Sequence, residues 1–383
     1  MTYEVAEGDF VGRQVGGYKS HMKKYKDFDK LLLLMMFLIF AIGVASIYSA
    51  AKSRNMPVAE SFFFKQLSWM GIGIVVLILT ISISYQRFID IAYVIYGLNV
   101  ILLALVLVLG HIRLGAQRWF SIGGFAFQPS EFIKLSLILA LSSYATAKKY
   151  SMRELKNLIV PILLLAIPFV LVLLQPDLGT ALLLVPIFFA VMVVSGARLR
   201  YLGVMILMGF AGLPVFWHFL RDYQRQRLLV FVNPNIDPLG AGYTIIQSKI
   251  AVGSGGLFGK GWLNGTQNQL NFLPERHTDF IFSVIGEEWG FLGAAALLLI
   301  YFFIVKRAFN IAVLTSDVYG KTIASGIGVM IGLQVVINVA MTIGLMPVVG
   351  IPLPLVSYGG SSLIATVFAI GLLINVGIRR STF

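Results

Sequence analysis

Residues 31–50 read LLLLMMFLIFAIGVASIYSA, an apolar run without a charged side chain. A helix rises about 1.5 Å per residue, so this run is long enough to cross the hydrocarbon core of a bilayer, which is about 30 Å thick. Four lysines precede it: Lys23, Lys24, Lys26 and Lys30. Because positively charged segments are retained on the cytoplasmic side, this first span predicts a cytoplasmic N-terminus.

The composition of the chain extends this prediction to many spans. Hydrophobic residues make up 58% of the 383 residues and charged residues 12%, and the mean hydropathy is +0.87. A water-soluble globule does not have this composition. Further apolar runs follow at residues 67–84, 88–110, 129–146, 158–174, 178–195, 201–219, 280–305, 323–342 and 357–376. We therefore expect an all-α polytopic membrane protein with about ten transmembrane helices.

The connections between the runs predict the orientation. Alternate connections are basic, as at 148–156 and 306–321, and these are expected in the cytoplasm together with both termini. The connection at 221–279 then lies outside, between the seventh and eighth spans. Its mixture of aromatic, aliphatic and glycine residues favours a structured outer loop over disorder. Within it, residues 243–250 predict a short amphipathic helix on the membrane surface.

The remaining composition limits the classes of site. The chain has no cysteine and its histidines are scattered, so neither a disulfide framework nor a thiolate metal site is expected. The net charge of +13 is carried mainly beside apolar runs, where it attracts anionic lipid headgroups, and no nucleic-acid role is expected. Ser20-His21-Met22 resembles a cloning scar. Residues 1–22 are therefore interpreted as a leader, and residues 23–383 as a single membrane domain.

The sharpest cluster of titratable groups precedes the span that begins near residue 280. The stretch NFLPERHTDFIF at 271–282 contains Glu275, Arg276, His277 and Asp279. Such groups at the edge of a span are placed for chemistry on a membrane-bound substrate. An alternative is equally open, because Thr278 and Asp279 are also good first-turn residues for the following helix.

Charged and broken segments occur at other membrane edges. Glu131 and Lys134 are three residues apart at a helix start, and they predict either a structural ion pair that holds two helices in register or a pair facing a wet cavity. Asp177 is most simply an N-cap. The Pro- and Gly-containing stretch at 350–362 is expected to line the same cavity as the outer loop.

The glycine-rich run at 253–261 does not match a phosphate-binding loop. The required glycine is absent at position 254, and no Ser or Thr follows Lys260. We interpret the run as a flexible connector of backbone turns, from which Lys260 could still reach a diphosphate.

Several motifs together resemble those of one family. They are GAQRW at 115–119, QPSE at 128–131, QPDLGT at 175–180, DYQRQR at 222–227, DPLGAGY at 237–243, LPERHTDFIF at 273–282 and PLPLVSYGG at 352–360. In this order they are similar to the motifs of the SEDS family (shape, elongation, division and sporulation). The resemblance covers essentially everything after Lys23. Gln117, Arg276 and PVVGIP at 347–352 resemble the members for rod elongation more than those for division.

The resemblance implies a peptidoglycan glycosyltransferase that polymerises lipid II at the outer face of the cytoplasmic membrane. The essential outer-loop aspartate of the family corresponds to Asp279, and its buried acid and base pair to Glu131 and Lys134. Forming a β-1,4 bond with inversion needs a base on the acceptor hydroxyl and stabilisation of departing undecaprenyl diphosphate. Asp279 is the candidate base. Candidates for the diphosphate are a divalent cation, Mg or Mn, or the side chains of Arg118, Arg225, Arg227, Lys249, Lys260 and Arg276.

The resemblance also implies partners, namely a class B penicillin-binding protein with transpeptidase activity, lipid II, nascent glycan and membrane lipids. Two other functions stay open from the residues alone. A lipid II flippase would suit a helical bundle, but a transporter carries its key charges near the membrane midplane, whereas the sharpest cluster here lies in an outer loop. A scaffold for cell-wall synthesis proteins would need no catalytic carboxylate.

Overall fold

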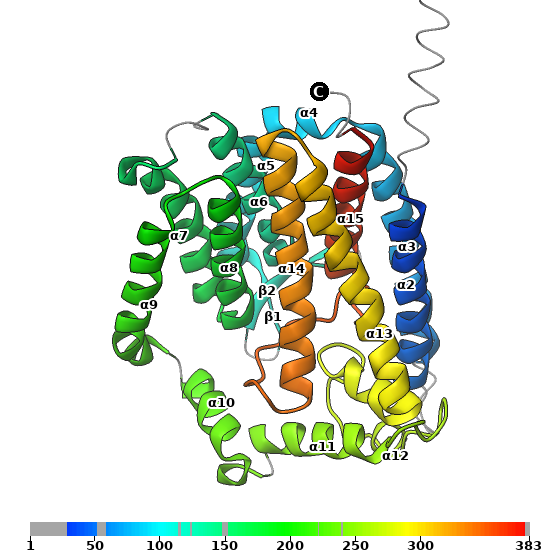
Figure 1. Ribbon diagram of the computed structural model, residues 1–383. Coiled ribbons are helices and arrows are strands. Elements are labelled where there is room, and N and C mark those ends of the chain that lie inside the picture. Colours follow the sequence, from blue (N-terminus) through cyan, green and yellow to red (C-terminus); the bar gives the residue numbers. More distant parts are fainter. Residues whose placement is uncertain are drawn as a thin grey trace, which may run out of the picture.

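The computed structural model describes residues 29–51, 59–113, 116–122, 125–147, 152–220, 222–238 and 240–379, so the leader predicted at 1–22 lies outside the described residues. The described chain is a helical bundle (Figure 1). Its α-helices are α2 (Lys30–Ala51), α3 (Ala59–Ser82), α4 (Tyr85–Asp90), α5 (Ala92–Leu109), α6 (Pro129–Ala147), α7 (Ile159–Leu174), α8 (Leu178–Val194), α9 (Leu199–Phe219), α10 (Asp222–Val232), α11 (Ala241–Ser254), α12 (Thr266–Gln269), α13 (Ile281–Leu314), α14 (Val318–Thr342) and α15 (Gly360–Arg379).

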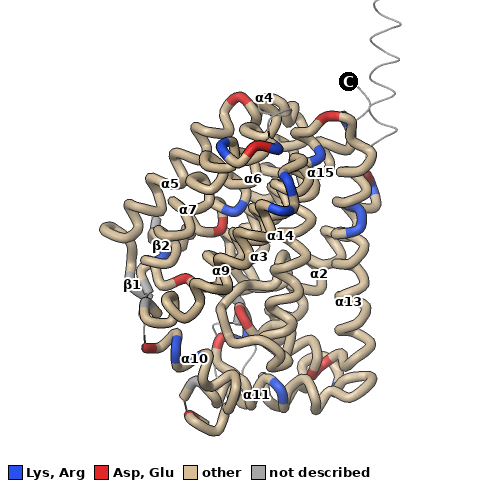
Figure 2. Tube along the Cα trace, turned by 60° about the vertical axis from the view of Figure 1, so that its left-hand side comes forward, with Lys and Arg blue, Asp and Glu red and all other residues tan. Residues whose placement is uncertain are grey.

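The predicted membrane class is confirmed by the helices. Within the described ranges, eight helices are long and apolar enough to cross a membrane: α2, α3, α5, α7, α9, α13, α14 and α15. The predicted runs at 129–146 and 178–195 also form helices, α6 and α8. However, α8 is shorter, and α6 carries Glu131 and Lys134 and is buried along most of its length. A total of ten crossings therefore stays a prediction. Figure 2 shows long uncharged stretches along α5, α7 and α13, as membrane contact requires.

A small antiparallel sheet between α5 and α6 was not expected from the sequence. Its strands are β1 (His111–Arg113), β2 (Ala116–Ile122) and β3 (Phe125–Phe127), in the order β1-β2-β3. Phe120 of β2 pairs with Phe127 of β3, and His111 of β1 pairs with Trp119 of β2. Two of the strands are three residues long, too short for an alternating pattern to be recognised. The sheet matters because β2 carries Arg118 and Trp119.

Polar contacts at both ends fix the direction of the first helix. Arg307 of α13 donates a hydrogen bond to the Asp29 carboxylate, and Ser49 of α2 donates one to Glu288 of α13. Helices α2 and α13 are therefore antiparallel. The start of α2 and the end of α15 lie at the same end of the bundle in Figure 1, which agrees with the predicted even number of crossings.

The predicted outer loop is structured, and its helices α10, α11 and α12 cover the other end of the bundle (Figure 1). The helix predicted at 243–250 is part of the longer α11. In α11, Ile245 is buried, whereas Ile250 is exposed. Helix α11 packs mainly against α13, so it is a protein-packed helix with one exposed edge.

The glycine-rich run forms backbone turns, as predicted, but it is fastened to α13, so the expected flexibility was wrong. The amides of Lys260 and Gly261 donate to the carbonyls of Glu287 and Glu288 at 3.0 Å each, and the amide of Phe291 donates to Gly256 at 2.9 Å. Helix α13 kinks between these contacts at Gly290, where φ is 66°. The close approach of the two backbones explains the need for glycine.

Candidate active site

A cavity of about 810 Å³ opens at the end of the bundle covered by the outer loop. Four parts of the chain line it: the start of α3, the β2–α6 region, the segment at 275–279 and the segment at 349–362. Thr180 of α8 and Tyr223 and Arg227 of α10 complete the lining. The prediction that residues 350–362 line the same cavity as the outer loop is confirmed.

The segment that carries Asp279 is held through its backbone. Three consecutive carbonyls accept hydrogen bonds: that of His277 from the Tyr358 amide (2.9 Å), that of Thr278 from Ser357 Oγ (2.6 Å) and that of Asp279 from Asn338 Nδ2 (3.0 Å). The donors come from α14 and from the segment at 349–362, so tertiary contacts set the position of Asp279.

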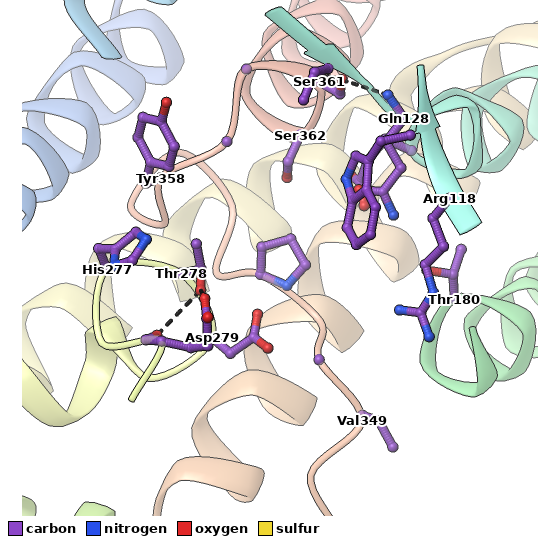
Figure 3. A pocket seen from close by; sticks show the side chains of 18 of the residues that line it. Arg118, Gln128, Thr180, His277, Thr278, Asp279, Val349, Tyr358, Ser361 and Ser362 are labelled. Atoms are coloured by element: carbon purple, nitrogen blue, oxygen red, sulfur yellow. Dashed lines mark hydrogen bonds between the residues drawn. The ribbon is translucent and has the colours of Figure 1, made fainter. Parts of the chain in front are cut away.

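The helix-cap alternative for Asp279 was wrong. Helix α13 begins at Ile281, and its N-cap is Phe280, which makes no side-chain capping hydrogen bond. Thr278 Oγ1 donates instead to the carbonyl and carboxylate of Glu275. Asp279 lines the cavity, and in Figure 3 it lies across the pocket from Arg118. Its Oδ2 is 3.3 Å from the position that a Cβ would take on Gly350, where φ is 72°.

The surroundings of Asp279 make its carboxylate a stronger base. Burial raises its pKa to about 6, and the nearby Glu275 adds to the rise, while Arg227 and Arg118 oppose it. A carboxylate with a pKa near neutrality remains mostly ionised at pH 7 yet accepts a proton readily. The two guanidinium groups also bring positive charge to the same cavity.

Arg118 is anchored on β2 and reaches the start of α8. Its Nε donates to the Gln175 carbonyl at 3.0 Å, and a terminal nitrogen donates to Pro176. Its other terminal nitrogen lies 3.9 Å from Asp177 Oδ1. Asp177 is the predicted N-cap of α8, since its carboxylate accepts the Thr180 amide at 3.2 Å. The sheet therefore places a cation beside a rigid helix start.

Glu131 and Lys134 form the predicted ion pair. Lys134 Nζ lies 2.8 Å from Glu131 Oε2, and both side chains are almost completely buried. Both belong to α6, so the pair lies within one helix. Only Glu131 lines the cavity, with Lys134 behind it. The start of α6 is in turn attached to α15, because the Gln128 amide donates to Ser361 Oγ at 3.0 Å. The ion pair is confirmed, but it does not join two helices, and only its acid, Glu131, faces the cavity.

The structure separates the six predicted diphosphate candidates. Arg118 and Arg227 line the cavity, whereas Arg225, Lys249, Lys260 and Arg276 do not. Arg225 donates to the carbonyls of Trp217 and His218, and Arg276 donates to Ala50 at 2.6 Å.

The two lysine candidates also lie elsewhere. Lys260 Nζ lies 2.8 Å from Oε1 of the buried Glu287. The side chain of Lys249 packs against Gly344. Glu287 of α13 pairs with Lys260 of the glycine-rich run, and Glu288 accepts a hydrogen bond from Ser49 of α2.

Aromatic residues and a lysine of α3 form a cavity wall that sequence reasoning missed. The ring of Phe62 lies 4.7 Å from that of His277 and 4.9 Å from that of Tyr358. Burial lowers the pKa of His277. Phe62, Lys65 and Trp69 all line the cavity. Their spacing of three and four residues marks one helix face, a signal that could have been read from the sequence.

The predicted divalent cation is not matched by a cluster of acidic and imidazole ligands. Among the residues that the structure describes, no group of three or more His, Cys, Asp or Glu side chains could hold a metal ion. The requirement for Mg or Mn stays a prediction.

These features define a polytopic helical membrane protein with a charged cavity at one end of its bundle. Comparison with known proteins makes the assignment specific, because a family profile described as "Cell cycle protein", for FtsW, RodA and SpoVE, matches residues 29–382. The chain belongs to this family, which is the SEDS family that the sequence motifs indicated.

Individual relatives agree with this assignment. The chain is 39% identical to the "Peptidoglycan glycosyltransferase MrdB" of Escherichia coli (strain K12), covering 94% of this chain and 95% of the relative. It also resembles the solved structure of the rod shape determining protein RodA of Thermus thermophilus, with a TM-score of 0.70 and 34% identity over 92% of this chain and 98% of that one. A chain of a structure described as "Structural coordination of polymerization and crosslinking by a peptidoglycan synthase complex" gives a TM-score of 0.78 and 35% identity over 93% and 99%.

Proposed function

We propose that this chain is a peptidoglycan glycosyltransferase that polymerises lipid II into β-1,4 glycan strands during cell elongation. The observation that carries the proposal is the Asp279 carboxylate, which faces a cavity together with Arg118 and Arg227 at one end of a membrane bundle. The enzyme class is supported by relatives named peptidoglycan glycosyltransferase, which match nearly the whole chain.

The proposed reaction joins two lipid-linked substrates. The 4-hydroxyl of the GlcNAc of lipid II attacks the anomeric carbon of MurNAc at the end of the growing glycan. Asp279 takes the hydroxyl proton while the new C–O bond forms and the bond to undecaprenyl diphosphate breaks. A single displacement inverts the α-linked donor to a β product without a protein nucleophile. The electron pair of the broken bond remains on the diphosphate.

The departing diphosphate needs positive charge close to the reacting carbon. Arg118 and Arg227 are the candidates, because both line the cavity and both lower the pKa of Asp279, which places them within electrostatic reach of the base. Contacts to the carbonyls of Gln175 and Val348 hold them in position before substrate arrives. Such preorganised charge stabilises the transition state without reorganisation. Glu131 and Lys134 shape the cavity floor near the acceptor.

The same proposal includes location and partner. With both termini in the cytoplasm, the end covered by α10 to α12 faces outward, and lipid II would enter the cavity from the outer leaflet. A class B penicillin-binding protein is the proposed partner. This is supported by the likeness to a chain of a structure described as a peptidoglycan synthase complex that coordinates polymerisation and crosslinking.

The deciding experiment is polymerisation of purified lipid II by this protein together with its partner transpeptidase. The original chain is compared with Asp279→Asn, after both are shown to fold and to bind the partner. Glycan from the original chain only is the expected result. Equal glycan from both would contradict the role of Asp279. No glycan from either, with the complex intact, would favour a lipid II flippase or a scaffold instead.

A further inference from the structure

Lys65 is a cavity cation that the proposed reaction has not used. It lies on α3 between Phe62 and Trp69, and all three side chains line the cavity. A lysine near the end of a span often reaches the lipid headgroups. Here, however, the lysine shares one helix face with two residues that are turned to the cavity.

The helix around Lys65 is attached to the segment at 349–362. The Gly359 amide donates to Gln66 Oε1 at 3.4 Å, and Gln66 Nε2 donates to the Ser357 carbonyl at 3.5 Å. The Trp69 indole lies directly over Gly360, where an added Cβ would be 2.0 Å from the ring. These contacts fix the backbone of α3 at the cavity wall, where Lys65 is one of the lining residues.

Lys65 differs from the other cavity cations in its partners. Arg118 donates to two carbonyls and lies near Asp177, and Arg227 donates to the Val348 carbonyl at 3.1 Å. Lys65 is exposed, and it makes no hydrogen bond or ion pair with the residues that the structure describes. An ammonium group that has no partner among the described residues, in a cavity at a membrane edge, is available to an anionic ligand.

The proposed reaction involves two diphosphates, one on each substrate. The donor diphosphate is bonded to the reacting carbon and must leave close to Asp279. The acceptor diphosphate is attached to the other end of its disaccharide, so it lies one disaccharide away from the hydroxyl that Asp279 deprotonates. Arg118 and Arg227 act electrostatically on Asp279 and suit the first diphosphate. The second one needs a cation on a different wall.

We propose that Lys65 binds the diphosphate of the acceptor lipid II, while Arg118 and Arg227 serve the donor. This inference rests on the proposed function, because it assigns the second of its two lipid diphosphates. Phe62 and Trp69, about one turn before and after Lys65 on α3, add apolar surface to the same cavity wall. Lys65 therefore determines how tightly the acceptor is held and has no part in the proton transfer.

The test separates donor from acceptor. A lipid II analogue methylated on its GlcNAc 4-oxygen can act only as donor. Its coupling to unmodified lipid II gives a capped product. The rate of capped-product formation, measured while one substrate is varied and the other is held constant, gives a KM for the donor analogue and a KM for the acceptor lipid II. For Lys65→Gln we expect the acceptor KM to rise about 10- to 100-fold, as for the loss of a charge-assisted hydrogen bond. The donor KM should change less than about twofold, because in this proposal Lys65 makes no hydrogen bond to the donor. Lys65→Arg should restore most of the acceptor affinity.

Lys306→Gln is the matched control, because Lys306 is exposed on α13 near Arg307, at the other end of the bundle. It should leave both KM values unchanged. An unchanged acceptor KM in Lys65→Gln, or equal changes in both KM values, would overturn the inference while leaving the polymerase intact. If the original chain makes no product, the proposed function fails. In that case, binding of undecaprenyl diphosphate tests whether Lys65 binds a lipid diphosphate, independently of polymerase activity. Weaker binding by Lys65→Gln than by the original chain would support the site at Lys65, and equal binding would refute it.

Discussion

Asn338 donates its side-chain amide to two carbonyls at once, that of Asp279 at 3.0 Å and that of Ile351 at 2.8 Å. Asn338 is fully buried in α14. It therefore connects the segment that carries the candidate base to the adjacent segment at 349–362. Removing this amide should move Asp279 without touching the carboxylate itself.

We expect Asn338→Leu to lower kcat more than tenfold with a smaller change in KM, because the base is displaced while the binding walls remain. Two buried carbonyls lose their donor, which should cost about 2–5 kcal/mol in the free energy of unfolding. Gln334→Leu is the control, one turn earlier on the same helix, with a side-chain oxygen that has no partner among the described residues. Equal effects of both substitutions on kcat would argue against positioning by Asn338.

The pH dependence of polymerisation should report the proton affinity of Asp279. Its pKa is raised to about 6, and only the ionised carboxylate can act as base. The value of kcat/KM should therefore rise as the pH increases through about 6 and become constant at higher pH. Glu275→Gln should shift this rise to lower pH, because Glu275 contributes to the raised pKa. An identical profile for both proteins would mean that another group titrates.

Asp279 should also cost stability above its pKa. The pKa of this carboxyl group is 3.8 in the unfolded chain and about 6 in the folded protein. Its contribution to the free energy of unfolding is therefore fully present below pH 3.8 and is lost as the pH rises through about 6. At pH 7.5, Asp279→Asn should therefore have a Tm equal to or above that of the original chain, although we expect it to make no glycan. The comparison is repeated at pH 5, where the difference should shrink. A clearly lower Tm of the variant at pH 7.5 would contradict this.

The buried ion pair on α6 should be sensitive to loss of one partner. Lys134→Met leaves the Glu131 carboxylate buried without its cation, which should cost about 3–5 kcal/mol in the free energy of unfolding. The double variant Glu131→Gln with Lys134→Met should regain much of this stability but not the activity, since Glu131 lines the cavity. Full polymerase activity of Lys134→Met would rule out a role of the pair in the acceptor site.

The contact between the glycine-rich run and α13 can be tested with two alanines. At Gly259, φ is 81° and a Cβ would be 2.2 Å from the Glu288 carbonyl oxygen, so Gly259→Ala should lower the Tm strongly. At Gly253 a Cβ meets nothing within 4 Å, so Gly253→Ala should be close to neutral. Thermal unfolding of both variants in the same detergent gives the comparison.

Much of the fold and part of the site could be predicted locally. Hydropathy follows the chain, so apolar runs such as that at 31–50 identify membrane helices before any packing is known. Glu131 with Lys134, and Asp177 as a cap, could also be predicted, because their partners are three residues away. The small sheet could not be predicted, since its short strands depend on pairing with one another.

The sequence by itself determined the membrane class, the family motifs and the candidate base Asp279, because these depend on composition and on residues close together in the chain. Only the tertiary structure decided between the cap and the cavity for Asp279. It likewise separated Arg118 and Arg227 from the other cations and brought Lys65 to the same cavity. The physical reason is that the cavity walls come from segments as distant as 62–69 and 349–362. Their meeting depends on helix packing, which no local pattern contains.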